Sequence, residues 1–159
     1  MNEGIRYVGY DEVTDVYRKM MEASGGGLGG VREEQGIRKT LEFVENDEYY
    51  LEFADKLTYI VYAFCAGHYS YDGNKRMSLT MGAYFLHKNA MYWQACMFMK
   101  QFENIVYHVA ASRIDEELLG RTVRCFIENK DYDEELRIDI ARAMSKGGTG
   151  TGNDTKWAE

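Results

Sequence analysis

The sequence contains no proline, whereas average amino-acid usage would predict roughly eight in a chain of 159 residues. Apolar residues recur at helical spacing along most of the chain, so the turns must be made largely by the 16 glycines. A hydrophobic content of 45%, with 13 tyrosines and 7 phenylalanines, is enough to fill a core. The chain is therefore predicted to be mainly α and to form one compact domain.

Seven segments have the apolar pattern of a helix. They are residues 10–24, 32–44, 50–66, 74–88, 96–111, 115–128 and 134–144. Residues 50–66 are apolar almost all round, which is typical of a central buried helix, and Gly67 is well placed to end it. Residues 1–145 are predicted to form the domain. Residues 146–159 have no periodicity and are predicted to be a disordered tail, because their GTGTGN stretch has no strand before it and no helix after it.

The charge of the chain disfavours several kinds of partner. A formal net charge of −7 opposes sequence-independent nucleic-acid binding, which needs Lys and Arg to displace counterions from phosphates. The N-terminus lacks a basic and then apolar signal, and the most apolar run, residues 57–66, is too short to span a bilayer. We therefore expect a cytoplasmic protein with no nucleic-acid partner and no membrane partner.

The three cysteines, Cys65, Cys96 and Cys125, are odd in number and form no CxxC pair. This pattern indicates neither a disulfide framework nor a zinc site. All three are predicted to be buried core thiols.

A glycine-rich segment, GGGLGGV at residues 25–31, holds five glycines around one leucine. Such a composition cannot propagate a helix and suits a turn or a β-hairpin. We expect the segment to be an exposed flap or a linker.

The stretch HYSYDGNKR, residues 68–76, places several chemical groups at the start of a predicted helix. The first N–H groups of a helix lack internal acceptors and lie at the positive end of its dipole, so phosphate oxygens are natural ligands there. Gly73 lets the backbone approach a phosphate, and Asn74 can cap the helix and present an amide donor. Lys75 adds a point charge and Arg76 a bidentate fork.

Two more residues of this stretch complete a possible site. Asp72 is the single carboxylate that Mg²⁺ needs when its other ligands are phosphates and water. His68 can accept a proton near pH 7. Taken singly, the histidine could be a helix C-terminal cap, the Asp-Gly pair could form a turn, and the Lys-Arg pair could lie on a solvated face. The spacing of all these residues within one short stretch favours a site made of a base, a metal ligand and a phosphate cradle.

HYSYDGNKR resembles the motif HxFx(D/E)(G/A)N(G/K)R of the Fic/Doc family, with six fixed residue types matched. GGVREEQGIRKTLEF resembles the glycine flap and following helix of Doc-like proteins, and FADKLTYIVYAFCAG resembles the helix that leads into the motif. The resemblance extends from Tyr10 to Asn129. It implies a helical bundle of about six to seven helices with a short glycine-rich β-hairpin flap.

The resemblance also implies a role for each motif residue. His68 would be the general base for a hydroxyl of a target protein, and Asp72 would bind Mg²⁺. Gly73 and Asn74 would form an anion hole, and Lys75 and Arg76 would bind phosphates. The flap would pair with an extended target segment as an added strand. The flap residues are Gly27, Leu28, Gly29, Gly30 and Val31.

Two departures from the family pattern bear on the chemistry. Ser70 stands where the family usually has a Phe that anchors the loop, so Tyr69 or Tyr71 must substitute for it or the loop is looser. Adenylyl-transferring members continue GNGRxxR, whereas this chain has Lys75 and Leu79 at the second Gly and the second Arg. Both changes point to the Doc branch, in which the lysine obstructs the usual α-phosphate position and the γ-phosphate is transferred.

The resemblance therefore implies a Doc-like toxin, a Mg²⁺-dependent kinase that uses ATP or another nucleoside triphosphate. Its acceptor would be a Ser, Thr or Tyr hydroxyl of a cytoplasmic protein, with a translation factor as the family-level expectation. Protein adenylyl transfer (AMPylation) is one alternative, and a non-catalytic interaction module that lost turnover through Ser70 is another. No (S/T)xxxE(G/N) inhibitory motif occurs in the sequence, so we expect a small antitoxin that inhibits in trans.

Overall fold

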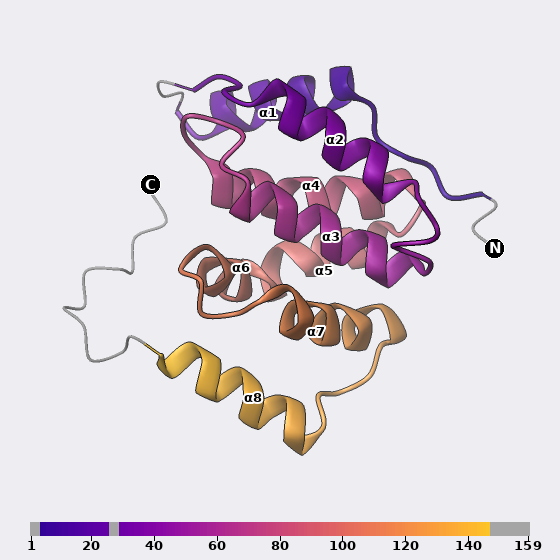
Figure 1. Cartoon of the computed structure of the whole chain (residues 1–159), viewed down its shortest axis with the longest axis vertical. Helices are drawn as coiled ribbons and strands as arrows, with labels where there is room; N and C mark the ends of the chain where they lie inside the picture. The colour runs from indigo at the N-terminus through magenta and orange to yellow at the C-terminus, as the bar shows by residue number, and fades with distance from the viewer. Residues whose placement is uncertain (1–3, 26–28, 147–159) are drawn as a thin grey trace.

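The computed structural model describes residues 4–25 and 29–146, which form eight α-helices (Figure 1). They are α1 (Tyr10–Ala23), α2 (Glu34–Val44), α3 (Phe53–Ala66), α4 (Asn74–Lys88), α5 (Tyr92–Gln101), α6 (Glu103–Ala110), α7 (Glu116–Glu128) and α8 (Glu134–Ser145). The predicted mainly α fold is confirmed. The predicted disordered tail lies outside the described residues, apart from Lys146.

The helices are arranged in layers (Figure 1). α1 and α2 lie on one side of α3 and α4, α5 to α7 lie on the other side, and α8 is outermost against α7. Nine of the 14 residues of α3 are buried, so the prediction of a central buried helix is confirmed, although α3 begins only at Phe53. Among the described helices, none combines the length and the apolar character needed to cross a membrane.

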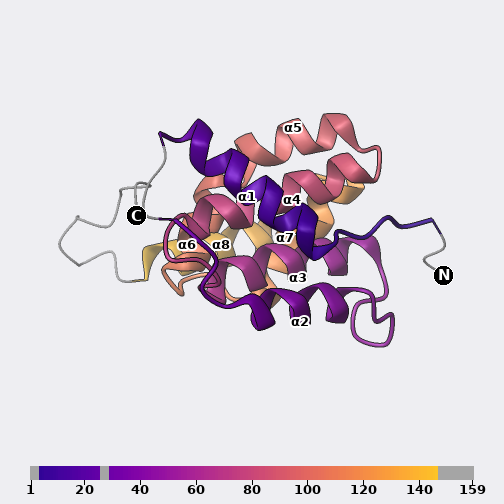
Figure 2. The same cartoon turned by 90° about the horizontal axis from the view of Figure 1, so that it is seen from above.

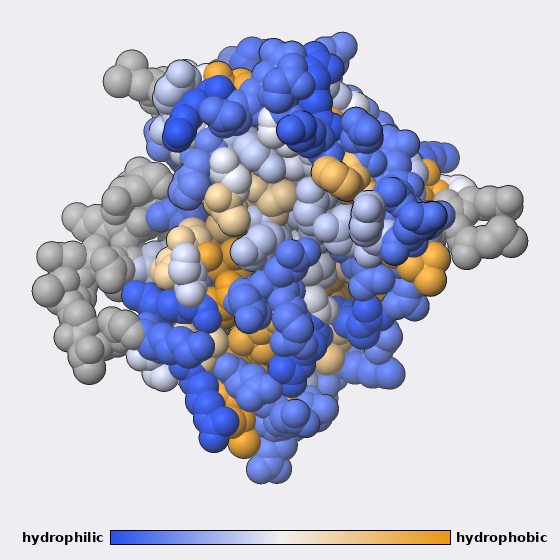
Figure 3. Space-filling view, in the orientation of Figure 1, coloured by the Kyte–Doolittle hydropathy of each residue, from blue (hydrophilic) through white to orange (hydrophobic). Residues whose placement is uncertain are grey.

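The surface differs in polarity along the stack of layers. The face seen in Figure 3 is mainly polar over α1 and α2, and apolar residues gather over α6 toward α8. α8 buries Leu136, Ile140 and Ala143. It therefore covers apolar surface that α7 would otherwise expose to water.

The segment predicted to be one helix over residues 96–111 is two helices, α5 and α6. The interruption falls at Phe102, whose ring is fully buried, stacked on Phe98 at 4.5 Å between centroids and edge-on to Phe126 at 5.3 Å. The chain bends there so that Phe98 and Phe102 can enter the same core. α5 also begins at Tyr92, four residues before the start of the predicted helix.

The three cysteines do not share one environment. Cys65 is buried on α3, as predicted, whereas Cys96 is exposed and Cys125 is only half-buried. Cys96 lies on the outer side of α5, which packs against α4 and α6 with its other side. The prediction of a core thiol is thus wrong for Cys96.

A partly buried ion pair joins α1 to the end of α4, two helices that lie side by side in Figure 2. Glu12 accepts hydrogen bonds from Lys88 Nζ at 2.5 and 2.6 Å, from the Tyr84 hydroxyl at 2.6 Å and from Gly9 N–H at 3.0 Å. Burial alone would raise the pKa of Glu12, but these hydrogen bonds outweigh it and lower the pKa to about 2. The hydrogen bond to Glu12 and burial raise the pKa of Tyr84 to about 12.

Glu12 is therefore expected to stabilise the fold in its ionised form. Its folded pKa lies below the ordinary value of 4.5, so this stabilisation is present above pH 4.5 and disappears as the pH falls toward 2. Glu12→Gln should lower the free energy of unfolding at pH 7 by about 1–3 kcal/mol, since the group is partly solvated. Urea unfolding at pH 7 and pH 3 should show a smaller difference between the two proteins at pH 3.

The matched control is Glu22→Gln. Glu22 is an exposed glutamate of α1 whose ion pair with Arg18 joins two solvated side chains. Its replacement should change the free energy of unfolding by no more than about 0.5 kcal/mol at either pH. An equal and pH-independent effect of both substitutions would contradict the role given to Glu12.

Candidate active site

The motif loop, residues 67–73, joins α3 to α4. It lies at the end of the molecule where the connection from α1 to α2 and helix α6 also lie (Figures 1 and 2). α3 ends at Ala66 and α4 begins at Asn74, as the sequence predicts. Three segments that are distant in sequence therefore meet around the loop.

His68 follows Gly67, the C-cap of α3, and is exposed to solvent. Its φ of 51° lies in the left-handed region, which non-glycine residues rarely adopt and which costs about 1–3 kcal/mol. Such a conformation persists only where the surrounding structure enforces it. The predicted general base is thus exposed to solvent where the chain turns out of α3 into the loop.

Tyr69 anchors the loop to the core. Its ring packs edge-on against Phe64 at 5.5 Å between centroids, and its hydroxyl lies 2.6 Å from that of Thr40 on α2. Two glycines make room for the ring, because an added Cβ would lie 2.3 Å from it at Gly67 and 2.6 Å from it at Gly36. The anchor that the family pattern places two residues after the histidine is here supplied by the residue directly after it.

Ser70 does not loosen the loop, although it replaces the expected Phe. It is 4% exposed, and the Asn74 side chain holds its backbone in both directions. Ser70 N–H donates to Asn74 Oδ1 at 3.0 Å, and Asn74 Nδ2 donates to the Ser70 carbonyl at 2.8 Å. The Asn74 amide, expected to serve a phosphate, is used here to close the loop. Tyr71, the other possible anchor, is 69% exposed.

Gly73 is the N-cap of α4, with a φ of 78° that favours glycine. An added Cβ would lie 3.1 Å from Met21 Sδ and 3.4 Å from the Arg76 guanidinium. The Gly73 N–H donates to Asp72 Oδ1 at 2.8 Å, and within the described part of the chain no side chain caps α4. The first backbone N–H groups of α4 are therefore suited to an anionic ligand.

Lys75 and Arg76 leave α4 toward different neighbours, since successive helical residues point about 100° apart. Lys75 Nζ lies 5.7 Å from the centroid of the Tyr107 ring on α6. Burial raises the pKa of the Cys65 thiol to about 12, against the lowering effect of the Lys75 charge. Arg76 instead lines a cavity formed with α1. Lys75 therefore faces α6 and Arg76 faces α1, so the two cations lie on different sides of the α4 N-terminus.

The cavity beside Arg76 has a volume of about 580 Å³ and lies between α1, α4 and α5. Its wall is mainly apolar and includes Val16, Met20, Leu79, Tyr84 and Met99. Arg76 Nε is buried and has no hydrogen-bond partner among the described residues, and Nη2 lies 4.0 Å from Asp72 Oδ2. An anion in this cavity would therefore meet a guanidinium. Leu79, at the position of the second Arg in adenylyl-transferring members, lines the same cavity.

Only part of the flap can be described, since Gly27 and Leu28 lie outside the described residues. Val31 forms an antiparallel bridge with Ser70, flanked by hydrogen bonds from Tyr71 N–H to Gly30 O at 3.1 Å and from Arg32 N–H to Tyr69 O at 2.7 Å. Residues 30–32 thus pair with the motif loop, and no β-hairpin is present in the described segments. In this pattern the N–H and C=O of Val31 point to the opposite, outer edge.

Tyr17 is a site residue that the apolar pattern of residues 10–24 does not distinguish from its neighbours. Its hydroxyl accepts from Gly30 N–H at 3.1 Å and donates to the Asp72 carbonyl at 2.9 Å. One side chain of α1 therefore joins the flap segment to the motif loop. The buried helical stripe gives no sign of this, because the hydroxyl is used only where two distant segments meet.

Asp72 is suited to a metal that arrives with phosphates. Its side chain is 34% exposed, and one of its oxygens accepts the Gly73 N–H. In the described ranges, no group of three or more His, Cys, Asp or Glu side chains could hold a metal by itself. Mg²⁺ commonly takes one or two carboxylate oxygens and completes its octahedron with phosphates and water, so the donor set fits a metal–nucleotide complex.

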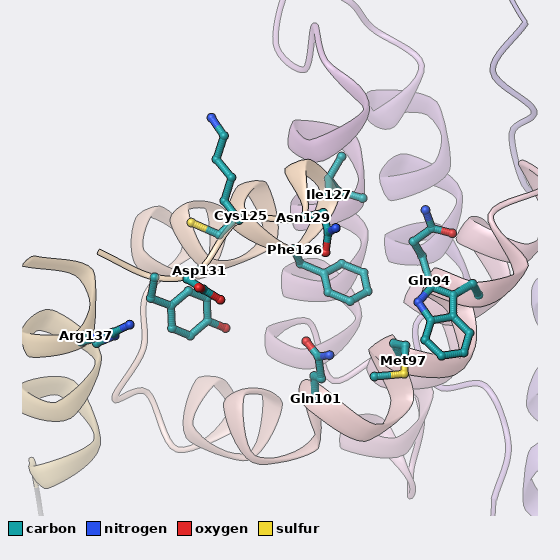
Figure 4. A pocket seen from close by; sticks show the side chains of 12 residues that line it. Gln94, Met97, Gln101, Cys125, Phe126, Ile127, Asn129, Asp131 and Arg137 are labelled. Carbon is teal, nitrogen blue, oxygen red and sulfur yellow. The ribbon is translucent and has the colours of Figure 1, made fainter. Parts of the chain in front are cut away.

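A larger cavity, of about 770 Å³, lies between α5, the end of α7 and the start of α8 (Figure 4). Its wall shares no residue with the motif loop or with the flap segment. Gln94, Gln101 and Asn129 supply amides, and Cys125 supplies a thiol whose pKa burial raises. The larger cavity volume therefore does not identify the chemical site. The groups suited to catalysis lie in the motif loop instead.

The chain was compared with known protein families, curated proteins and solved structures. The model of the Fic/DOC family matches residues 7–86, half of the chain. The match covers α1 to α3, the flap, the motif loop and nearly all of α4, and it ends before α5. No curated protein and no solved structure matches the chain.

The anchoring role of Tyr69 predicts a graded response to substitution. Tyr69→Phe keeps the ring and loses one hydrogen bond, so it should lower the free energy of unfolding by about 1 kcal/mol. Tyr69→Ala should lower it by about 2–4 kcal/mol and speed amide hydrogen exchange at Ser70 and Tyr71. Urea unfolding and exchange measurements check both effects. Tyr71→Ala is the control, and an effect as large as that of Tyr69→Ala would contradict the assignment.

Proposed function

This chain belongs to the Fic/DOC family, and we propose that it is a Doc-like kinase acting on a hydroxyl side chain of a target protein. Members of the family are Fic-type transferases that move nucleotide-derived groups to proteins and use nucleoside triphosphates, generally with a metal. They act on protein targets and often occur in toxin–antitoxin pairs. The target expected here is a cytoplasmic protein, with a translation factor as the family-level choice.

The observation that carries this proposal is the shape of the motif loop. Three contacts define it: the Tyr69 ring in the core, the Asn74 amide on Ser70 and the Tyr17 hydroxyl on Asp72. A non-catalytic module that lost turnover through Ser70 would be expected to have a loosened loop. The well-packed loop therefore favours catalysis over that alternative.

The proposed reaction is a direct phosphoryl transfer. His68 takes the proton of the target hydroxyl, and the hydroxyl oxygen bonds to the γ-phosphorus as the bond from that phosphorus to the bridging oxygen breaks. The leaving group is the nucleoside diphosphate. The exposed position of His68 lets a residue of another protein reach it.

The phosphates would be bound at the N-terminus of α4. Backbone N–H groups at Gly73 and Asn74 would form the anion hole, with the Gly73 N–H exchanging its hydrogen bond to Asp72 Oδ1 for one to a phosphate oxygen. Lys75 and Arg76 would neutralise the chain of phosphates from two sides. Asp72 would hold Mg²⁺, which supplies charge neutralisation of the phosphate oxygens when bound. The cavity beside Arg76 has room for part of the nucleotide.

Two residues favour phosphoryl over adenylyl transfer. Lys75 replaces the second Gly of the adenylyl-transferring pattern, and its ammonium lies toward α6 and Tyr107. Leu79 replaces the second Arg, so the cavity wall is apolar one turn after Arg76. Adenylyl transfer remains the second candidate, because Asp72 and Arg76 would serve either reaction.

The flap would align the target. The outward N–H and C=O of Val31 offer the hydrogen bonds of an added antiparallel strand, next to the loop that contains His68. The remaining flap residues proposed for this role are Gly27, Leu28, Gly29 and Gly30. A backbone-mediated contact would leave the target's Ser, Thr or Tyr side chain directed at the loop.

An inhibitor in trans would suit the same cleft. The chain has no internal inhibitory motif, so we propose a small antitoxin whose segment folds on this surface. The mainly apolar cavity between α1, α4 and α5 would take its apolar side chains. An acidic or apolar side chain would lie beside Arg76, whose Nε is buried.

His68→Ala should abolish transfer and leave the fold intact, because the side chain is exposed. Loss of a general base commonly lowers the rate by about 10²–10⁴. Single-turnover transfer to the target, or to total lysate protein, measures the effect. His87→Ala, which removes an exposed histidine at the far end of α4, is the control and should leave the rate unchanged.

Isotope labelling separates the candidate functions. Purified protein incubated with lysate and Mg²⁺ should transfer label from γ-labelled ATP and none from α-labelled ATP. Transfer from α-labelled ATP alone would establish adenylyl transfer instead. Absence of transfer from either nucleotide, in a lysate of a sensitive host, would favour the non-catalytic module.

Expression of this chain alone should arrest growth, and co-expression of the neighbouring open reading frame should relieve the arrest and yield a copurified complex. Met99→Lys, at the exposed rim of the cavity, should weaken the complex. Ile138→Lys on α8, with similar exposure, should not. Harmless expression of active enzyme with no copurifying partner would contradict both the antitoxin and the toxin role.

A further inference from the structure

The ring of Tyr107 on α6 lies near two cations, Lys75 at the start of α4 and Arg113 after the end of α6. Lys75 Nζ lies 5.7 Å from its centroid, and the Arg113 guanidinium carbon lies 6.0 Å from the same centroid. Both distances are within the range at which a cation is attracted to an aromatic face. Arg113, which follows α6 and is distant from the motif in sequence, therefore lies on the Lys75 side of the motif helix.

Arg113 is held in place by the turn that follows α6. Ser112 adopts a φ of 60°, and Arg113 N–H donates to the His108 carbonyl at 2.9 Å. Arg113 Nη1 also lies 3.3 Å from His108 Nδ1. Burial first, and then the Arg113 charge, lower the pKa of His108, so near pH 7 its neutral ring can accept a hydrogen bond at Nδ1. The guanidinium is thus oriented by a ring above it and an imidazole beside it.

We propose that Arg113 determines specificity for polyphosphate, by binding with Lys75 one end of a phosphate chain whose other end Arg76 binds. Arg76 lies on the α1 side of the α4 N-terminus and Lys75 on the α6 side. A single phosphate can contact one side, whereas a chain of phosphates can contact both. Arg113 adds a bidentate fork beside the point charge of Lys75. The inference rests on the proposed function, because it assumes that phosphates bind at α4.

This arrangement also accounts for the missing second arginine of the motif. With Leu79 at that position, Arg76 is the one arginine among the described residues that line the cavity on the α1 side, where Lys19 and Asp15 also lie. Arg113 provides a second guanidinium on the α6 side, where Lys75 lies.

Binding measured by isothermal titration calorimetry at constant ionic strength tests the inference without requiring turnover. The probes are Mg²⁺ with ATP, Mg²⁺ with inorganic tripolyphosphate, and AMP. Arg113→Gln should raise the Kd of ATP and of tripolyphosphate about tenfold and leave that of AMP unchanged. Tyr107→Phe should bind like the wild type because the ring remains, whereas Tyr107→Leu should weaken tripolyphosphate binding.

Two further variants separate a local role from a general effect of charge or folding. Arg142→Gln on α8 makes the same change of net charge outside the site and should have no effect. Arg113→Lys keeps the charge, and its recovery of part of the affinity would support direct binding of phosphate. Thermal unfolding of each variant confirms that the protein tested is folded.

The outcomes distinguish this inference from the proposed function. If Arg76→Gln weakens ATP binding and Arg113→Gln does not, the role of Arg113 is overturned and the proposed function stands. If Arg113→Gln weakens AMP and tripolyphosphate equally, its specificity for polyphosphate is overturned. If the folded wild-type protein binds none of the three probes, the proposed function fails and this inference fails with it.

Discussion

The burial of α3 on all sides is the constraint on which the rest of the structure depends. Its apolar residues cover the whole circumference, so helices must pack against it from more than one direction. α2 and α4 do so on one part of its surface, and α6 and α7 on another. The chain leaves this helix at Gly67 and must turn at once to reach α4. The motif loop therefore lies where several helix ends meet.

Polar contacts from three helices then define that loop. Thr40 of α2 meets the Tyr69 hydroxyl, Tyr17 of α1 donates to Asp72, and Asn74 of α4 closes the turn on Ser70. Each contact pairs a side-chain group that would otherwise be partly buried without a partner. The loop can therefore keep a strained His68 and a left-handed Gly73 within a few residues of each other. These contacts also explain why a serine can stand where the family usually has the aromatic anchor.

The electrostatics of the site are local rather than global. The chain is acidic overall, yet Lys75 extends toward α6 and Arg76 toward α1 at the α4 N-terminus, where the helix dipole adds to their charge. A net charge of −7 opposes binding to an extended polyanion, but it does not prevent binding of a compact anion at a helix end. The same distinction explains how an acidic protein can be suited to a nucleotide.

The sequence by itself determined the helical class, the central buried helix and the residues of the motif, because each is local. The spacing of apolar residues specifies a helix, and HYSYDGNKR is one short stretch that begins α4 as expected. The break at Phe102 and the exposure of Cys96 were missed, because periodicity does not show how two phenylalanines enter one core. Only the tertiary structure decided that Tyr69 replaces the anchor, that Tyr17 joins flap to loop, and that Tyr107 approaches Lys75. These contacts join segments far apart in the chain, and their geometry arises from packing around α3, which no local pattern encodes.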